Sequence, residues 1–182
     1  MNFTAPLRFA LFGPESTGKT TLAQTLAAHF GEPWSPEYVR EFWDTHGGVI
    51  SALDLDAIAR GQLAGEDAAA AGARRGVFHD TELLTCMLWD DLLFPSACPP
   101  WVRAEADRRA RGVTLWLLCD TDLPWSPDPQ RCFPDAIGRA MCRKLWRNTL
   151  ETRGLPFAEI TGGWPERTAR AIAAVGQALA AS

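Results

Sequence analysis

The sequence predicts an α/β fold in which a parallel sheet of five strands is covered by helices on both faces. Strand-like apolar segments alternate with helix-like segments along the chain, as they do in successive βαβ units. The segment 112–119 is an unbroken apolar run, which is typical of a strand whose two faces are both buried. The length of 182 residues and the 47% apolar content suit one domain with a large core, so we expect residues 1–182 to form a single domain.

Five segments have the character of strands. The apolar run 7–12 begins the series, and 112–119 is the clearest member. The second strand is weakly supported because Pro33 and Pro36 interrupt it, although the chain must return to the sheet near this point. The expected strands lie at 7–12, about 33–37, 75–80, 112–119 and 155–160.

Helix-like segments separate these strands. Leu22 and Leu26 lie on one face of the first helix, and Gly31 follows it where a left-handed cap is common. Ser51 or Asp54 can cap the third helix. The expected helices lie at 18–30, 38–46, 53–72, from 81 to the prolines at 95–100, 101–111, 135–153 and 164–180.

The segment 120–134 fits neither element type. It contains prolines at 124, 127, 129 and 134 and is too polar for a regular element. It is also too long to be a simple connection, because most connections have about 2–6 residues. We therefore expect a mobile lid loop at about 120–134.

Residues 13–20 read Gly-Pro-Glu-Ser-Thr-Gly-Lys-Thr and match the phosphate-loop pattern G-x-x-x-x-G-K-[ST] between a strand and a helix. Gly13 and Gly18 permit backbone angles and close approaches that a side chain would block. Lys19 reaches the β- and γ-phosphates of a nucleotide, and the Thr20 hydroxyl binds Mg²⁺. The pattern predicts a P-loop NTPase fold that binds ATP together with Mg²⁺.

The alternative is an ordinary glycine-rich turn between a strand and a helix. That interpretation leaves Lys19 unexplained in a chain whose only other lysine is Lys144. The loop residues expected to bind ATP are Gly13, Glu15, Ser16, Thr17, Gly18, Lys19, Thr20 and Thr21.

Asp80 ends the third expected strand, at the sheet edge where ligands bind in parallel α/β folds. Mg²⁺ prefers a hard anionic oxygen, so Asp80 is expected to complete the metal site with Thr20. The alternative is that Asp80 caps the helix beginning at Thr81.

Glu37 and Arg40 follow the second expected strand. A carboxylate there can bind sugar hydroxyls or accept a proton from the attacking hydroxyl, and an arginine can contact the substrate or the transferring phosphoryl group. We assign Glu37, Tyr38, Arg40, Asp80 and Trp125 to substrate binding. Surface charges at the start of a helix are the alternative for Glu37 and Arg40.

The lid loop contains Trp125 and Arg131. An arginine brought in by closure stabilises charge on the equatorial oxygens during phosphoryl transfer, and Arg139 and Arg143 are substitutes for this role. Trp125 offers a flat face for a heteroaromatic ring, or it simply anchors the loop. The expected catalytic residues are Lys19, Glu37, Asp80 and Arg131.

Thr161-Gly162-Gly163 follows the last expected strand, where its backbone groups can hold adenine, although a plain turn explains the triplet nearly as well. We assign Thr161 to ATP binding.

Composition argues against several classes of partner. The net charge is −4 with no block of like charges, so we expect no nucleic-acid partner. Residues 1–6 have no basic segment ahead of an apolar run, and no apolar stretch is long enough for a membrane span. Five cysteines without a C-x-x-C pair indicate reduced thiols, and we expect a cytoplasmic protein that contacts no membrane. Oligomeric state is not predicted.

These motifs together resemble the ribosylnicotinamide kinase domain of the bacterial NadR proteins. The matching segments are 13–20, 37–41, Asp80-Thr81, and Asp122-Leu123-Pro124-Trp125 followed by Asp128 and Arg131. The resemblance implies transfer of the γ-phosphate of ATP to the 5′-hydroxyl of nicotinamide riboside, which gives nicotinamide mononucleotide. It also implies that Glu37 and Asp80 serve the acceptor and the metal, that Trp125 contacts the nicotinamide ring and that Arg131 belongs to the closing lid.

The sequence differs from the resembled proteins in two respects. The resembled proteins usually carry an adenylyltransferase domain ahead of the kinase domain, and the 182 residues show no such segment, so we do not expect a bifunctional or regulatory role. The segment 127–130, Pro-Asp-Pro-Gln, is stiffer than the glycine-containing version associated with the family. Two alternatives stay open: an ATPase or nucleotide-dependent switch acting on a protein partner, and a kinase for another nucleoside or a sugar.

Overall fold

The five strands form one parallel sheet in the order β2-β3-β1-β4-β5. We describe them from a computed structural model, which places residues 5–181. The prediction that residues 1–6 carry no export signal concerns four positions, 1–4, that lie outside the described residues. The strands are β1 Leu7–Phe12, β2 Trp34–Ser35, β3 Gly76–Asp80, β4 Leu115–Cys119 and β5 Phe157–Ile160.

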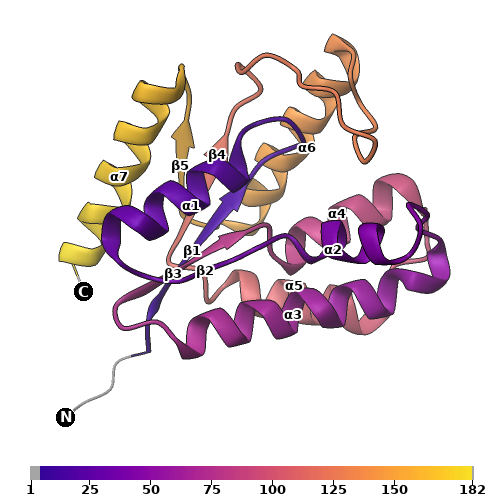
Figure 1. Cartoon of the computed structure of the whole chain (residues 1–182), viewed down its shortest axis with the longest axis horizontal. Helices are drawn as coiled ribbons and strands as arrows, with labels where there is room; N and C mark the ends of the chain where they lie inside the picture. Colours follow the sequence, from indigo (N-terminus) through magenta and orange to yellow (C-terminus); the bar gives the residue numbers. More distant parts are fainter. Residues whose placement is uncertain (1–4, 182) are drawn as a thin grey trace.

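Within the described residues, seven α-helices connect and cover the strands (Figure 1). They are α1 Lys19–Phe30, α2 Tyr38–Thr45, α3 Leu55–Ala71, α4 Leu83–Leu93, α5 Pro100–Ala110, α6 Ala136–Arg153 and α7 Trp164–Ala180. A short 3₁₀ turn, η1 Ala52–Asp54, precedes α3. Both residues expected to cap this region take part in its capping box: the Ser51 backbone N–H and hydroxyl donate to Asp54.

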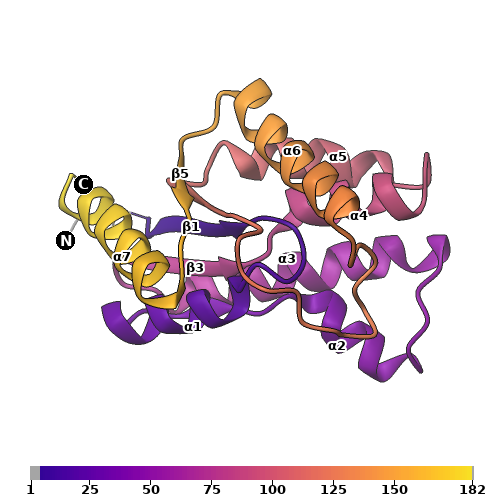
Figure 2. The same ribbon diagram turned by 90° about the horizontal axis from the view of Figure 1, so that it is seen from above.

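Alternating residues of β1 point into two separate cores, because both faces of a buried sheet are covered by helices and successive side chains point to opposite faces. Phe9 and Leu11 pack with α1 and α7 on one face of the sheet. Ala10 and Phe12 pack on the other face with residues of α3, α4, α5 and α6. Figures 1 and 2 show α1 and α7 on one side of the sheet and the larger group, α3 to α6, on the other. The predicted parallel five-stranded sheet with helices on both faces is confirmed.

Most element boundaries differ from expectation by one to three residues, and two of the differences have a clear local cause. The fourth strand begins at Leu115 rather than at 112, because Gly112 closes a turn by donating its N–H to the Arg109 carbonyl. The fourth helix begins at Leu83 rather than at Thr81, because Thr81 has a φ of +72°. A left-handed residue cannot begin a right-handed helix, so the chain turns once more before α4.

The strand register places the expected site at one edge of the sheet. Leu11 pairs with Asp80 on β3 and with Leu117 on β4, so the loop after Phe12 begins beside Asp80. Residues 120–134, which contain no helix or strand, pass around this loop in Figure 2. Among residues 5–181, no helix is both long and apolar enough to cross a membrane.

Candidate active site

Two glycines of the phosphate loop occupy positions where a side chain does not fit. Gly13 has a φ of +147°, and a Cβ there would lie 2.6 Å from the carbonyl oxygen of Cys119. Gly18 has a φ of +80°, and a Cβ there would lie 2.5 Å from the ring of Trp164. The loop therefore packs closely against β4 and α7, and it leads into the amino end of α1, where backbone N–H groups attract anions.

Lys19 is the first residue of α1, and its ammonium group folds back over the phosphate loop. Nζ donates a hydrogen bond of 2.9 Å to the Pro14 carbonyl, and the Thr17 hydroxyl donates one of 2.8 Å to the same oxygen. A single carbonyl thus holds the charged group in front of the loop amides. This is the position from which an ammonium can reach the terminal phosphates of a nucleotide.

Asp80 is the last residue of β3, and its exposed fraction is 1%. Neither carboxylate oxygen forms a hydrogen bond of ordinary geometry with the described residues. The pKa of Asp80 is raised to about 6, mainly by burial and secondly by the negative charge of Glu37. The charge of Lys19 and an interaction with the Thr20 hydroxyl lower this pKa by smaller amounts. The N-cap of α4 is instead Glu82, whose carboxylate accepts two backbone N–H groups, so the capping alternative for Asp80 does not hold.

A buried carboxylate without a partner, next to a threonine hydroxyl at a phosphate loop, is a suitable pair of hard oxygen ligands for Mg²⁺. Within residues 5–181, no group of three or more His, Cys, Asp or Glu side chains can hold a metal ion alone. Thr20 and Asp80 therefore fit a metal that takes its remaining ligands from phosphate and water, as Mg²⁺ usually does.

Glu37 is held by one hydrogen bond to each carboxylate oxygen. The Thr81 hydroxyl donates to Oε1 at 3.2 Å, and Arg40 Nε donates to Oε2 at 3.0 Å. Arg40 also donates from Nη1 to Asp128 of the lid loop at 3.1 Å. The positive φ of Thr81 is a strained conformation, and such strain is concentrated at functional sites. Glu37 and Arg40 are therefore a positioned acid–arginine pair rather than free surface charges.

The lid loop is attached to the phosphate loop through two polar side chains. The Glu15 carboxylate accepts the backbone N–H of Cys132 at 2.8 Å and that of Phe133 at 2.6 Å. The Ser16 hydroxyl accepts the backbone N–H of Ser126 at 3.0 Å. These contacts place the lid loop directly over the phosphate loop.

Arg131 projects from the lid toward the phosphate loop, and its side chain is 17% exposed. Its Nη1 donates to the Ser126 carbonyl and lies 3.5 Å from Ser16 Oγ, while its Nε has no partner among the described residues. The substitutes for this role are engaged elsewhere. Arg139 donates to two carbonyls at the start of the lid, and Arg143 forms an ion pair with Asp120.

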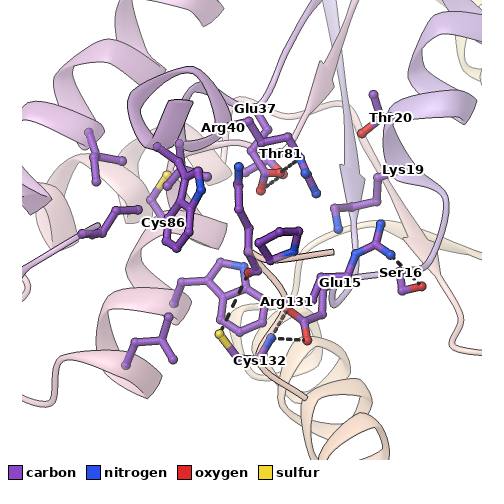
Figure 3. Close-up of a pocket in the computed structure, with 18 of the residues that line it drawn as sticks. Glu15, Ser16, Lys19, Thr20, Glu37, Arg40, Thr81, Cys86, Arg131 and Cys132 are labelled. Atoms are coloured by element: carbon purple, nitrogen blue, oxygen red, sulfur yellow. Dashed lines mark hydrogen bonds and ion pairs between the residues drawn. The ribbon is translucent and has the colours of Figure 1, made fainter. Parts of the chain in front are cut away.

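One cavity of about 340 Å³ joins these groups. The phosphate loop forms one end of it, the pair Glu37 and Arg40 lies in its wall, and Arg131 reaches it from the lid. Figure 3 shows these side chains, from three distant parts of the sequence, around a common space. The other end is apolar and is lined by Trp43, Ile50, Leu55, Ile58, Trp89, Leu93 and Phe94.

Several residues assigned from the sequence lie outside the wall of this cavity. The Tyr38 ring packs on Gly61, where a Cβ would lie 2.0 Å from a ring carbon. Trp125 lies between Arg131 and Arg139, whose guanidinium carbons are 5.7 Å and 5.5 Å from its ring centroid. Thr161 lies beyond the phosphate loop, next to Gly162, whose N–H donates to Asp122. Their roles in binding stay predictions.

Sequence reasoning did not identify the aromatic residues at the apolar end. Trp43 follows Arg40 by three positions on α2, so the two share a helix face, and this spacing was the available signal. Trp89 and Phe94 reach the cavity from α4 and from the residue that follows it, and no local pattern distinguishes them from core residues.

Arg167 of α7 also has no sequence signal. It is fully buried and donates to the carbonyls of Thr17 and Gly162, and it forms an ion pair with Asp122. One guanidinium therefore connects the phosphate loop, the loop after β5 and the start of the lid.

Comparisons with known proteins agree with this geometry. A family model described as an AAA domain matches residues 8–167. The trifunctional NAD biosynthesis/regulator protein NadR of Escherichia coli (strain K12) is 30% identical over 155 residues, which cover 83% of this chain and 37% of that protein. The resemblance to the NadR proteins is thereby confirmed.

Two crystal structures of NadR proteins share the fold. One, in complex with NR, has a TM-score of 0.79 and 20% identity, and the match covers 96% of this chain and 51% of that one. The other, in complex with NAD and AMP-PNP, has a TM-score of 0.74 and 21% identity, with coverage of 97% and 50%. The chain thus spans about half of these structures and about a third of the curated relative. At these identities the structural likeness establishes the P-loop fold.

Proposed function

The chain belongs to the AAA domain family, and from this premise we propose that it is an ATP-dependent kinase whose acceptor is the 5′-hydroxyl of nicotinamide riboside. The product is then nicotinamide mononucleotide. The observation that carries the proposal is the cavity of about 340 Å³, which has a phosphate loop at one end, an aromatic wall at the other and an acid–arginine pair between them. The NadR relative is named for NAD biosynthesis, and one of the two NadR structures holds NR while the other holds AMP-PNP.

The phosphate end binds and polarises the donor. The loop amides, the amino end of α1 and the Lys19 ammonium stabilise negative charge that develops on the transferring phosphoryl group. Thr20 and Asp80 are suited to hold Mg²⁺, which neutralises charge on the β- and γ-phosphates when it is bound. Asp80 must be ionised for this role, and its pKa of about 6 leaves it largely ionised at neutral pH.

Of the two predicted catalytic acids, Glu37 and Asp80, Glu37 is the one that faces the acceptor, because it lines the cavity and Asp80 does not. Thr81 and Arg40 occupy one hydrogen-bonding position on each of its oxygens, so the carboxylate has a fixed orientation and free lone pairs. It can bind a ribose hydroxyl or accept the proton that the attacking 5′-hydroxyl releases. The flanking Arg40 can pair with the phosphoryl group on the acceptor side.

Arg131 contributes from the lid. Its guanidinium lies over the phosphate loop next to Ser16, so a small movement brings it to the equatorial oxygens of the γ-phosphate. Closure of residues 120–134 would also exclude water, which competes with the 5′-hydroxyl as acceptor.

The apolar end suits a flat, positively charged heterocycle. Trp43 and Trp89 line it with indole surface, and a cation over an aromatic face is attracted to the ring quadrupole. The pyridinium ring of nicotinamide riboside has both properties. A sugar that carries no heteroaromatic base would leave this aromatic surface uncovered.

The test is a product assay with purified protein, Mg-ATP and a panel containing nicotinamide riboside, adenosine, cytidine, uridine and ribose. We expect ADP formation that depends on nicotinamide riboside, together with a product of the mass of nicotinamide mononucleotide. ADP formation that no acceptor stimulates would contradict the proposal. Hydrolysis stimulated by a captured protein, without a small phosphorylated product, would favour the nucleotide-dependent switch.

Two tryptophan variants test where the nicotinamide ring of the acceptor binds. Trp43→Ala should raise the acceptor KM about tenfold, because an aromatic surface is removed from the cavity wall. Trp125→Ala tests the lid residue suggested by the resemblance. If only Trp125→Ala raises the acceptor KM, the base binds under the lid and not at the apolar end.

A further inference from the structure

Asp90 is an acidic residue within the apolar end of the cavity. It belongs to α4, is 7% exposed and lines the same cavity as its neighbours Trp89, Leu93 and Phe94. Its Oδ2 is buried and has no hydrogen-bond partner in the part of the chain that the structure describes. An ionisable group in such a place is destabilising unless a partner compensates it.

Other buried carboxylates on this side of the sheet have an evident structural task. Glu82 accepts the backbone N–H groups that begin α4, and Glu66 pairs with Arg109 at 3.3 Å. Asp90 caps no helix and forms no ion pair within residues 5–181. The arginine near it, Arg103, is instead paired with the adjacent Asp91 through both carboxylate oxygens.

The charge state of Asp90 is compatible with ligand binding. Burial raises its pKa to about 6, while an interaction with the Cys98 thiol and the charge of Arg103 lower it. The side chain is therefore largely an anion at neutral pH, and in that state it can accept hydrogen bonds but cannot donate one. The Cys98 thiol is a weak donor to this carboxylate, and Oδ2 has no donor of ordinary geometry within residues 5–181, so the cavity is where a further donor can come from.

We propose that Asp90 is a specificity-determining residue of the acceptor site, which accepts a hydrogen bond from an N–H group on the acceptor's base and rejects a base that carries a carboxylate. This inference rests on the proposed function and deepens it. A carboxamide supplies the missing donor to a buried acceptor. A carboxylate at the same place sets two anions against each other in an apolar environment, where repulsion is weakly screened.

Nicotinamide riboside and nicotinic acid riboside test this discrimination between amide and carboxylate. They share the ribose and the pyridinium ring, and differ only in that the first carries a carboxamide and the second a carboxylate. We expect the wild type to prefer the amide by at least about tenfold in kcat/KM. Asp90→Asn removes the charge and adds an N–H donor that a carboxylate can use. This variant should reduce the preference about tenfold or more, through a gain with the acid as well as a loss with the amide.

Asp91→Asn is the matched control, because it changes the next residue of the same helix, whose side chain is 40% exposed and lies outside the cavity wall. It should keep the wild-type ratio. Asp90→Ala is a second variant at the same site, and thermal unfolding of each variant confirms that it is folded. Calorimetric titration of both ribosides in the presence of AMP-PNP measures binding without turnover.

The outcomes separate the two proposals. A wild type that phosphorylates both ribosides equally well, or an Asp90→Asn variant that keeps the wild-type ratio, would overturn the role of Asp90 and leave the kinase activity in place. A wild type that neither binds nor phosphorylates either riboside would overturn the proposed acceptor and the role of Asp90 together.

Discussion

The phosphate loop, residues 13–18, and the lid loop, residues 120–134, face each other across the site but are shaped in different ways. The phosphate loop obtains its conformation from residues close in sequence: two glycines at its ends, and the Pro14 carbonyl that holds both Thr17 and Lys19. The lid has no regular element and is positioned by Glu15, Ser16 and Arg40, residues about 90 to 120 positions away.

This difference determines what each loop can do. A locally specified loop presents its amides in one arrangement before the nucleotide arrives, which is the preorganisation that charge stabilisation requires. A loop held by a few side-chain contacts can exchange them for contacts to a ligand at small cost. The first loop is therefore suited to binding phosphate, and the second to opening and closing.

Removing the ammonium of Lys19 should have the largest effect. Lys19→Ala is expected to lower kcat roughly 10³-fold, because the charge that stabilises the transferring group is lost, while the fold is retained. Steady-state kinetics and circular dichroism measure the two quantities. Lys144→Ala, at an exposed position of α6, should change neither. An Lys19→Ala variant that is inactive because it is unfolded would not support the assigned role.

On the lid side, Arg131→Ala should lower kcat on the order of 10²-fold and weaken ATP binding much less. The reason is that the guanidinium meets the γ-phosphate chiefly in the transition state. Turnover is compared with the Kd of AMP-PNP from calorimetry, and Arg111→Ala, at an exposed position after α5, is the control. Equal losses in kcat and in affinity would make Arg131 a binding residue only.

Gly13→Ala tests whether the phosphate loop is as tightly constrained as its contacts indicate. The added Cβ would lie 2.6 Å from the Cys119 carbonyl oxygen at a φ of +147°. We expect a loss of about 1–3 kcal/mol in the free energy of unfolding, measured by urea denaturation. Gly65→Ala adds the same atom to α3 with nothing within 4 Å and should be neutral or stabilising. Equal stabilities for the two variants would show that the loop can relax.

Asp80, behind the phosphate loop, provides a pH-dependent test. Its pKa is about 6 in the folded protein, above the unfolded value of about 4. The ionised side chain therefore destabilises the fold above pH 6, and this cost disappears as the pH falls below the unfolded value. Asp80→Asn should be more stable than the wild type by about 1–3 kcal/mol at pH 8 without metal, and the gain should vanish near pH 4. Urea denaturation at both pH values measures this, and a gain independent of pH would contradict it.

The smallest effect is expected from loosening the lid. Glu15→Gln weakens the hydrogen bonds that the carboxylate accepts from Cys132 and Phe133, at a cost of about 1 kcal/mol. Hydrogen exchange of those two amides should become about fivefold faster, and exchange in the phosphate loop should not change. Glu41→Gln, at an exposed position of α2, is the control. Unchanged exchange in Glu15→Gln would mean that other contacts hold the lid.

The sequence by itself determined the phosphate loop, four of the five strands and the seven helices described in residues 5–181, because each depends on neighbouring residues: glycines at set spacings, apolar periodicity and turn residues. The remaining strand, β2, was expected only because the chain must return to the sheet. It also placed Glu37 and Asp80 correctly at one edge of the sheet, since the carboxyl ends of parallel strands meet there. Small errors arose where a single residue, such as Thr81 with its positive φ, overrode the local pattern.

Only the tertiary structure decided how distant segments meet. The apolar end of the cavity joins α2, α3 and α4, and Arg167 joins three loops through one guanidinium. Tyr38 and Trp125 show the converse, because both lie close in sequence to cavity residues and yet pack elsewhere. The direction of a side chain and the partner left for a buried charge such as Asp90 depend on packing between elements, and no spacing along the chain encodes that packing.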